Sequence, residues 1–333
     1  LLCANNMISN IRAIGSGSLA NVTRGIFSNA TNANDKYVYN SINLNGVDAS
    51  SSSSSHSAGI DFGVSATSPR IANNIIVNTM TTSDGVSRSY GIYMQSLPTG
   101  GSSDNNDLYI PSGFVGYDGA NHITILDWIT TGRDANSVSD DPHFVSATDL
   151  HLRNDVRTIA ESWGDTTGLS GVVVNDIDGD TRFGSSGYSG TGVGSDLGAD
   201  EGNYMKAYWL DISPISVNNP VNGSVKRIND TFTPSSTFKN VGYKRYQNFS
   251  VRMQIIRTAD NFSVYDETVP ISDLKVNESV DIAFPALTSN IIGTPGIYTA
   301  NASMASTDDN PDNNVYVSTF VVKGPLTGTF TVG

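Results

Sequence analysis

Short alternating apolar stretches recur along the first part of the chain at a nearly constant interval. The repeating stretches are ANNMISN at 4–10, VYNSINLN at 38–45, ANNIIVN at 72–78 and DNNDLYI at 104–110. They align on Asn6, Asn40, Asn74 and Asn106, which are 34, 34 and 32 residues apart. No long window shows apolar residues at helical spacing, so the pattern predicts short strands separated by turns.

A second mark keeps the same phase. Gly25, Gly59 and Gly91 lie in RGIFSN, AGIDFG and YGIYMQ, again 34 and 32 residues apart. Two marks in one phase indicate that each unit is one turn of a solenoid, with strands stacked about 4.8 Å apart. The rule for parallel crossovers then favours a right-handed parallel β-helix over residues 1–128.

The asparagine phase has a physical reason. Asparagine tolerates the left-handed backbone region at a corner, and its amide can both donate to and accept from the same residue one turn away. We therefore expect Asn6, Asn40, Asn74 and Asn106 to form a stacked structural ladder. The alternative is that these asparagines are ordinary surface turn residues.

From about residue 203 the alternating stretches become longer. FSVRMQIIRT at 249–258, SVDIAFPAL at 279–287, GIYTANASMAS at 296–306 and NVYVSTFVVKG at 314–324 are separated by clusters of turn residues. This pattern predicts a β-sandwich over residues 203–325. Residues 326–333 alternate again and are interpreted as a linker or the first strand of a further module.

Residues 129–202 carry three ordered motifs. These are DDPHFVSATDLHL at 140–152, NDIDGDTRF at 175–183 and DLGADE at 196–201. The set resembles the closing end of right-handed parallel β-helices, the fold of pectate-lyase-like proteins, in large bacterial surface polypeptides. The resemblance implies a terminal turn and cap, and no catalytic site.

The third region carries its own resemblance. FTPSSTFKNVG at 232–242, PGIYTANA at 295–302 and DDNPDNNVYVSTFVV at 308–322 are similar to the cell-adhesion-related immunoglobulin-like domains of bacterial surface proteins. The full expectation is an all-β chain: a right-handed parallel β-helix with a C-terminal cap, followed by an immunoglobulin-like β-sandwich. The acidic loop at 308–314 could hold calcium or form a polar hairpin.

Asp176, Asp178 and Asp180 form a second candidate calcium site, because alternate carboxylates on an extended loop can converge on one hard cation. The glycine of an EF-type loop stands at the sixth position, whereas Gly179 is fourth. The alternative is a tight turn in which these aspartates accept backbone N–H groups and Arg182 pairs with one of them. The expectation is therefore no cofactor, with calcium kept as an option.

Composition limits the partners. The chain has 333 residues, a net charge of −13 and only 15% charged residues. Such a surface repels phosphate, so we expect neither nucleic acid nor an anionic membrane surface as a partner. No apolar stretch reaches the length of a membrane span. The single cysteine, Cys3, excludes an intrachain disulfide.

Three classes of function remain. A polysaccharide-degrading enzyme needs acids brought together on neighbouring turns, and no acid recurs at the repeat phase. The alternative is a polysaccharide-degrading β-helix protein whose active site lies in turns not present in this chain. A glycan-binding module needs exposed aromatic rings, for which Tyr90, Tyr93, Tyr109 and Tyr117 are candidates. We favour a non-enzymatic structural or adhesive segment of an extracellular bacterial surface protein. Its expected partners are further modules or other copies, assembled head to tail, and it could also bind glycans.

Overall fold

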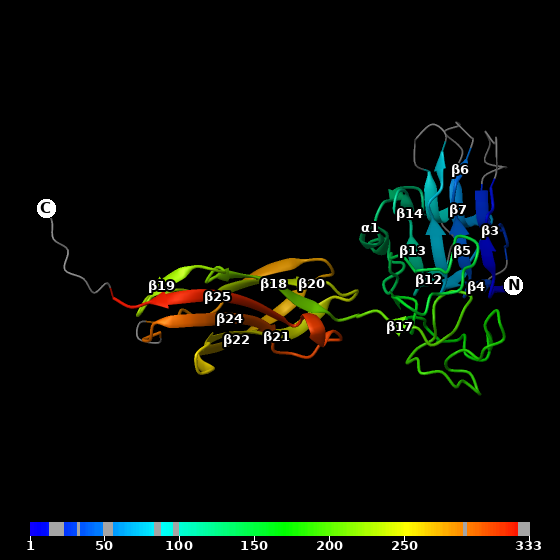
Figure 1. The fold of residues 1–333 in the computed structure, drawn as a ribbon. Helices are drawn as coiled ribbons and strands as arrows, with labels where there is room; N and C mark the ends of the chain where they lie inside the picture. The colour runs from blue at the N-terminus through cyan, green and yellow to red at the C-terminus, as the bar shows by residue number, and fades with distance from the viewer. Residues whose placement is uncertain are drawn as a thin grey trace. The chain divides into compact units, whose positions relative to one another are not determined.

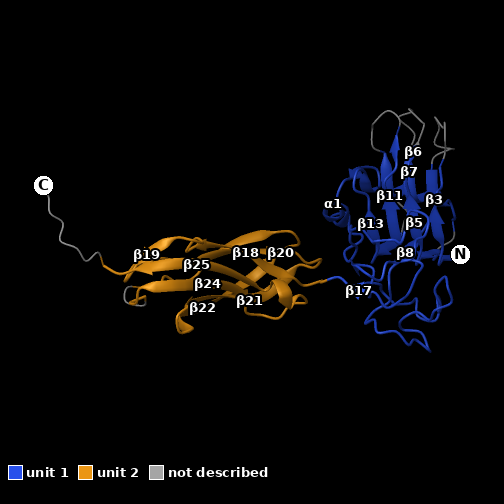
Figure 2. Ribbon diagram, in the orientation of Figure 1, with its two compact units in different colours: residues 1–207 blue, residues 208–333 orange. Residues whose placement is uncertain are grey.

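The computed structural model describes residues 1–325 except 13–22, 32–33, 49–55, 83–87, 96–99 and 289–291. The predicted first strand of a further module, residues 326–333, lies outside the described residues. The chain divides into two compact units, Leu1–Ala207 and Tyr208–Gly333, here called the stacked unit and the sandwich unit (Figure 2). The division falls five residues after the boundary expected at 202/203.

The described residues are almost entirely strand and loop, which confirms the all-β prediction. Helical structure is limited among them to α1 (Ile125–Ile129) and the short helix η2 (Pro311–Asn313). The apolar stretches are too short for amphipathic helices and are bounded by glycine, asparagine and serine, which favour turns.

The strands of the stacked unit lie in three sheets, in which strands of neighbouring repeats pair in parallel. Each repeat contributes one strand to each sheet, and several of these strands are labelled in Figure 1. The first sheet contains β1 (Leu2–Ala4), β4 (Lys36–Val38), β8 (Arg70–Ala72) and β12 (Ser102–Asp104). The second contains β2 (Met7–Ser9), β5 (Ser41–Leu44), β9 (Ile75–Asn78) and β13 (Asp107–Tyr109). The third contains β3 (Thr23–Ser28), β7 (Ser57–Phe62), β11 (Ser89–Met94) and β14 (Phe114–Tyr117).

Smaller elements complete the unit. β15 (Asn121–His122) pairs antiparallel with β14, and β6 (Val47–Asp48) pairs with β10 (Thr81–Thr82). β16 (Arg157–Thr158) pairs with β17 (Met205–Lys206). The strand register follows the repeat: Ile8, Ile42, Ile76 and Leu108 stand opposite one another. Ile42, Ile76 and Leu108 are fully buried in the core of the stack.

The glycine phase also has a structural cause. Gly59 faces the core so closely that a Cβ atom there would lie 2.2 Å from Ile76 Cγ2 and 2.9 Å from the Gly91 carbonyl oxygen. A side chain at this position would therefore displace the buried column.

The end of the stack is closed by residues 124–138. Thr124 caps α1 by accepting from the Asp127 N–H, and Trp128 of this helix packs over Gly116 in the core. Val138 then adds a parallel bridge to Asp107, the first residue of β13.

The rest of the predicted cap, residues 139–202, takes a different path from the one expected. The contacts of Asp140, Ala147 and Thr148 fall on Asp107, Asn43 and Ser9, which belong to successively earlier repeats. Residues 140–148 therefore run back along the side of the stack, and residues 163–175 do so again, from Asn105 past Asn73 to Asn5. The polar corners and the outer sheet face of the stack supply their hydrogen-bond partners.

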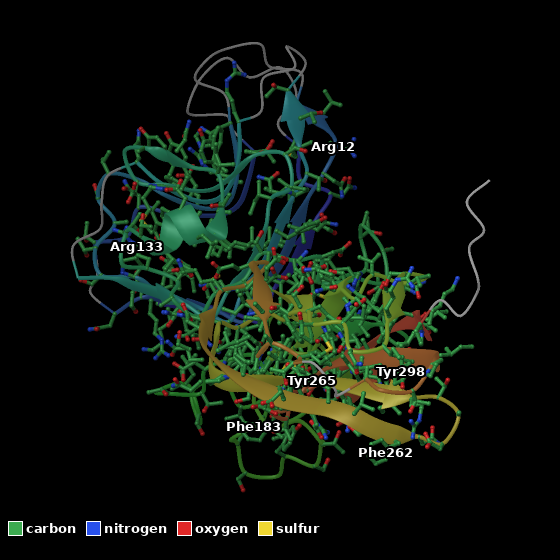
Figure 3. The ribbon with its side chains drawn as sticks, turned by 90° about the vertical axis from the view of Figure 1, so that its left-hand side faces the viewer. Arg12, Arg133, Phe183, Phe262, Tyr265 and Tyr298 are labelled. Atoms are coloured by element: carbon green, nitrogen blue, oxygen red, sulfur yellow. The ribbon has the colours of Figure 1, made fainter. Side chains whose placement is uncertain are left out.

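The sandwich unit consists of two sheets around one apolar core. One sheet has the order β18 (Ile212–Asn219), β20 (Ser235–Asn240), β23 (Ser279–Ala283). The other has the order β19 (Val225–Arg227), β25 (Val315–Lys323), β24 (Gly296–Met304), β21 (Tyr246–Arg257), β22 (Phe262–Leu274). Phe238, Tyr298 and Phe320 are fully buried between the sheets (Tyr298 is labelled in Figure 3).

Candidate functional site

The four repeat asparagines form one hydrogen-bonded row. Asn6 Nδ2 donates to Asn40 Oδ1 at 2.7 Å, Asn40 Nδ2 to Asn74 Oδ1 at 2.9 Å, and Asn74 Nδ2 to Asn106 Oδ1 at 3.0 Å. Each of these acceptor oxygens also accepts a hydrogen bond from the backbone N–H of the ladder asparagine in the repeat before. The amides thus satisfy buried polar groups in every corner of the stack.

The row ends on a residue that the repeat did not reveal. Asn106 Nδ2 donates to Asp134 Oδ1 at 2.9 Å, and Trp128 Nε1 donates to Asp134 Oδ2 at 2.7 Å. Asp134 is buried, and this burial raises the pKa of its carboxyl group. Its position, 28 residues after Asn106, departs from the repeat spacing, which is why the sequence pattern missed it.

We expected the ladder asparagine at each corner to have the left-handed backbone conformation. In the structure, the residue before it has this conformation instead. Asn5, Tyr39, Asn73 and Asn105 have φ between 52° and 58°. This places the ladder side chain inward and the preceding side chain outward at each corner. The outward side chains hold the segment that runs along the stack, for example through Asn73 Nδ2 and the Asp165 carbonyl oxygen at 2.8 Å.

The outer face of the β3–β7–β11–β14 sheet carries three of the aromatic candidates, Tyr90, Tyr93 and Tyr117, whereas Tyr109 lies on β13 of the second sheet. His56 stacks on Tyr93, with ring centroids 4.2 Å apart, and Tyr93 stacks on Tyr117 at 4.5 Å with an interplanar angle of 8°. Tyr90 stacks on Phe114 at 5.2 Å, and burial raises the pKa of Tyr90 to about 12. Because the rings face one another along the stack, much of their flat surface is already occupied by neighbouring rings.

The same face holds one acid with two basic partners. Asp61 is 2% exposed and forms an ion pair with Arg24, and His56 Nε2 lies 3.5 Å from its carboxylate. Arg24 also lies over the Phe27 ring, 4.4 Å from its centroid. The carboxylate is therefore neutralised by its neighbours in a closed group.

The predicted calcium triplet forms a turn. Asp176 Oδ1 accepts the N–H groups of Asp178 and Asp180, at 2.9 Å and 2.8 Å, and its Oδ2 accepts that of Glu201 at 3.0 Å. The carboxylates that lie within 4.8 Å of one another belong to Asp176, Asp178 and Asp200, with Asp180 outside the group. Asp180 contributes its backbone N–H to the turn, which donates to Asp176 Oδ1.

Two basic side chains lie near this turn, and one of them, Arg182, pairs differently from the expectation. His151 Nε2 lies 2.8 Å from Asp178 Oδ2, and the hydrogen bond to Asp149 is the main cause that raises the pKa of His151. Arg182 pairs with Glu201 and not with an aspartate of the turn. The reason is that Arg182 points into the interior, over the Tyr39 ring at 4.1 Å from its centroid.

The carboxylates at the acidic loop of the sandwich unit also accept hydrogen bonds from protein groups. Asp308 Oδ2 accepts the Ile212 N–H at 3.0 Å, and Asp211 accepts the side-chain amides of Asn310 and Asn313 at 2.9 Å and 2.8 Å. These bonds tie the loop before β25 to the start of β18. This is the polar hairpin alternative among the two readings of the sequence.

No family model matches the sequence, and no curated protein matches it. Among solved structures, the CARDB domain of a Pyrococcus furiosus protein, solved in complex with di-metal ions, is 20% identical with a TM-score of 0.27. The match covers 34% of this chain and 90% of that chain. A domain from Methanosarcina acetivorans, whose parent is named as a cell surface protein, is 23% identical over 34% of this chain and 93% of that chain, with a TM-score of 0.27.

Enzymes also appear at lower coverage of their own length. A β-glucosidase from Listeria innocua, solved in complex with glucose, is 14% identical with a TM-score of 0.24, over 35% of this chain and 16% of that chain. All three likenesses extend over about a third of this chain at low identity.

Proposed function

We propose that the chain is a structural and adhesive extracellular segment of a multidomain bacterial surface protein. In this proposal the stacked unit is a right-handed parallel β-helix and the sandwich unit is a cell-adhesion-related immunoglobulin-like domain. The fit of the parallel strand register to the sequence repeat supports the first assignment, and the resemblance of the β20, β24 and β25 sequences supports the second.

The observation that carries the proposal is the closed chemistry of the stack's outer face. A hydrolase of glycans needs two carboxylates placed about a glycosidic bond. On the β3–β7–β11–β14 face, Asp61 is buried between Arg24 and His56, and the tyrosines stack on one another. These contacts stiffen the stack and favour a scaffold over an active site.

The proposed partners are further modules of the same polypeptide or other copies of it, with head-to-tail assembly as the arrangement to test. Among the described residues, no helix is long and apolar enough to cross a membrane. The negative net charge disfavours nucleic acid. No cofactor is required by this role.

Two measurements test the proposal. Antibodies raised against the purified chain should label intact, unpermeabilised cells of the source organism, and external protease should remove the label. The purified chain should release no reducing ends from a panel of polysaccharides. Label confined to permeabilised cells would contradict the surface location. Polysaccharide cleavage that is lost in Asp61→Asn would contradict the non-enzymatic role.

A further inference from the structure

An open groove of about 380 Å³ lies on the outer side of the second sheet of the stacked unit, away from the closed aromatic face. Its strand side includes Asn43 of β5, Val77 of β9 and Tyr109 of β13. The register places these residues in one column across three consecutive repeats. The column therefore extends for about 10 Å along the stack, at one strand spacing per repeat.

The opposite side of the groove is supplied by residues 141–147, the first part of the segment that runs back along the stack. Hydrogen bonds hold this segment in place near both of its ends. The Asp140 N–H donates to Asp107 Oδ1 at 3.0 Å, and Asn43 Nδ2 donates to the Ala147 carbonyl oxygen at 3.0 Å. The groove is therefore preformed, which lowers the entropic cost of binding a ligand.

The lining combines flat apolar rings with neutral hydrogen-bonding groups. Tyr109 and Phe144 supply the rings, Asn45 an amide and Thr79 a hydroxyl group. A sugar ring has the matching chemistry, because its C–H face packs on aromatic rings while its hydroxyl groups both donate and accept. The volume lies within the range of about 300–1,000 Å³ that is typical of ligand sites.

Charge and backbone pairing narrow the choice of ligand. Asp141 borders the groove and is exposed, and the chain carries a net charge of −13, so an anionic ligand is disfavoured. An extended peptide would bind by adding a strand to an open sheet edge. Val77 pairs on one side with Asn43 and on the other with Tyr109, so the strand in the middle of the groove offers no open edge.

From these observations we propose that the groove binds a neutral oligosaccharide. Tyr109 would stack on one of its rings, and the amide of Asn45 and the hydroxyl of Thr79 would bind its hydroxyl groups. This inference goes beyond the proposed scaffold role, which needs no ligand in the groove. A surface scaffold without glycan affinity would leave that role standing.

The full chain is tested against neutral cello-, xylo-, manno- and chito-oligosaccharides of three to six units, by array binding and then by calorimetry. We expect at least one series to bind, with affinity that increases with length until the groove is filled. Tyr109→Ala should weaken this binding at least about tenfold, because it removes the aromatic stacking surface. Thr79→Trp should abolish binding by filling the groove from an exposed position.

The matched control is Tyr316→Ala, which removes a tyrosine that is 40% exposed on the sandwich unit. It should leave the affinity unchanged. Circular dichroism and thermal unfolding identify any variant that has lost its fold, and Thr79→Trp serves if Tyr109→Ala does so. The proposal is overturned if no neutral series binds, if both groove variants bind as the wild type does, or if the groove selects extended peptides.

Discussion

Arg182 Nη1 and Glu201 Oε2 lie 3.2 Å apart, in an ion pair whose two side chains are each only 1% exposed. Arg182 Nη2 also donates to Asn5 Oδ1 and to the Gly198 carbonyl oxygen, both at 2.9 Å. This one guanidinium therefore connects two motifs of the segment along the stack with the first corner of the stack itself. A buried pair of this kind depends on both partners.

Removing the guanidinium should strongly destabilise the stacked unit. Arg182→Leu leaves Glu201 buried without its partner, and the expected cost is about 3–5 kcal/mol. Thermal unfolding by calorimetry should show a lower transition for the stacked unit and an unchanged one for the sandwich unit. The control is Arg153→Leu, which removes an exposed pair with Asp155. Equal effects of the two substitutions would contradict the assigned role of Arg182.

Substitution of a ladder asparagine should also strongly destabilise the stacked unit. Asn74→Ala removes the acceptor for the backbone N–H and the amide of Asn40, together with the donor to Asn106. With buried polar groups left unpaired, we expect a loss of at least about 2 kcal/mol in unfolding free energy. Asn154→Ala, at an exposed position, should change it by less than about 0.5 kcal/mol. Denaturant titration of both variants checks this, and a similar midpoint for the two would refute the ladder's contribution.

The two units should respond differently as the pH falls from 7 to 4. Burial, and next to it the carboxylates of Glu201 and Glu161, raise the pKa of Asp196 well above its ordinary value. The folded stacked unit therefore holds this proton more tightly than the unfolded chain does. The corresponding stability is present below the ordinary carboxyl pKa of about 4 and is lost as the pH rises through the folded-state pKa.

Two carboxylates of the sandwich unit, Asp266 and Asp273, have the reverse shift, and their effect falls below about pH 4. Hydrogen bonds from Arg252 and Arg245 lower the pKa values of Asp266 and Asp273, so the stability they give is lost as the pH falls through those lowered values. Calorimetry between pH 7 and pH 4 should show the transition of the stacked unit rising relative to that of the sandwich unit. Asp196→Asn should reduce this relative rise. A parallel shift of both transitions would count against the assignment.

Calcium should have little effect on the stacked unit. Both carboxylate oxygens of Asp176 already accept backbone N–H groups, and Asp178 contacts His151. We expect the same unfolding temperature in millimolar calcium, in magnesium at equal ionic strength, and in a chelator. A calcium-specific increase that disappears in Asp178→Asn would show instead that the turn holds the ion.

The repeat could be predicted from the sequence because its cause is local and periodic. The ladder asparagines must recur wherever a corner recurs, and Gly59 must be glycine because its Cβ position is occupied by Ile76 and Gly91. The left-handed residue lies one position earlier in the chain than we expected. At that corner asparagine precedes asparagine in three repeats out of four, so residue type alone did not separate Asn73 from Asn74.

The path of residues 139–202 could not be predicted in the same way. The motifs there fix local turns, such as the one around Asp176, but not which surface those turns cover. Arg182 pairs with the carboxylate of Glu201, 19 residues away, and donates to the side-chain amide oxygen of Asn5, 177 residues away. The groove between Asn43 and residues 141–147 arises from this same long-range packing, and no spacing in the sequence signals it.

The asparagine ladder gives the stack a direction of hydrogen-bond donation. One N–H of each amide donates away from the first repeat, and the oxygens of Asn40, Asn74 and Asn106 accept from the repeat before, so the row of donors runs toward Asn106. The carboxylate of Asp134 lies at this end and accepts the last N–H. An ionised carboxylate accepts hydrogen bonds and donates none, so Asp134 can accept the last N–H of a row of any length. Repeats could thus be inserted or removed without changing the chemistry at which the row ends.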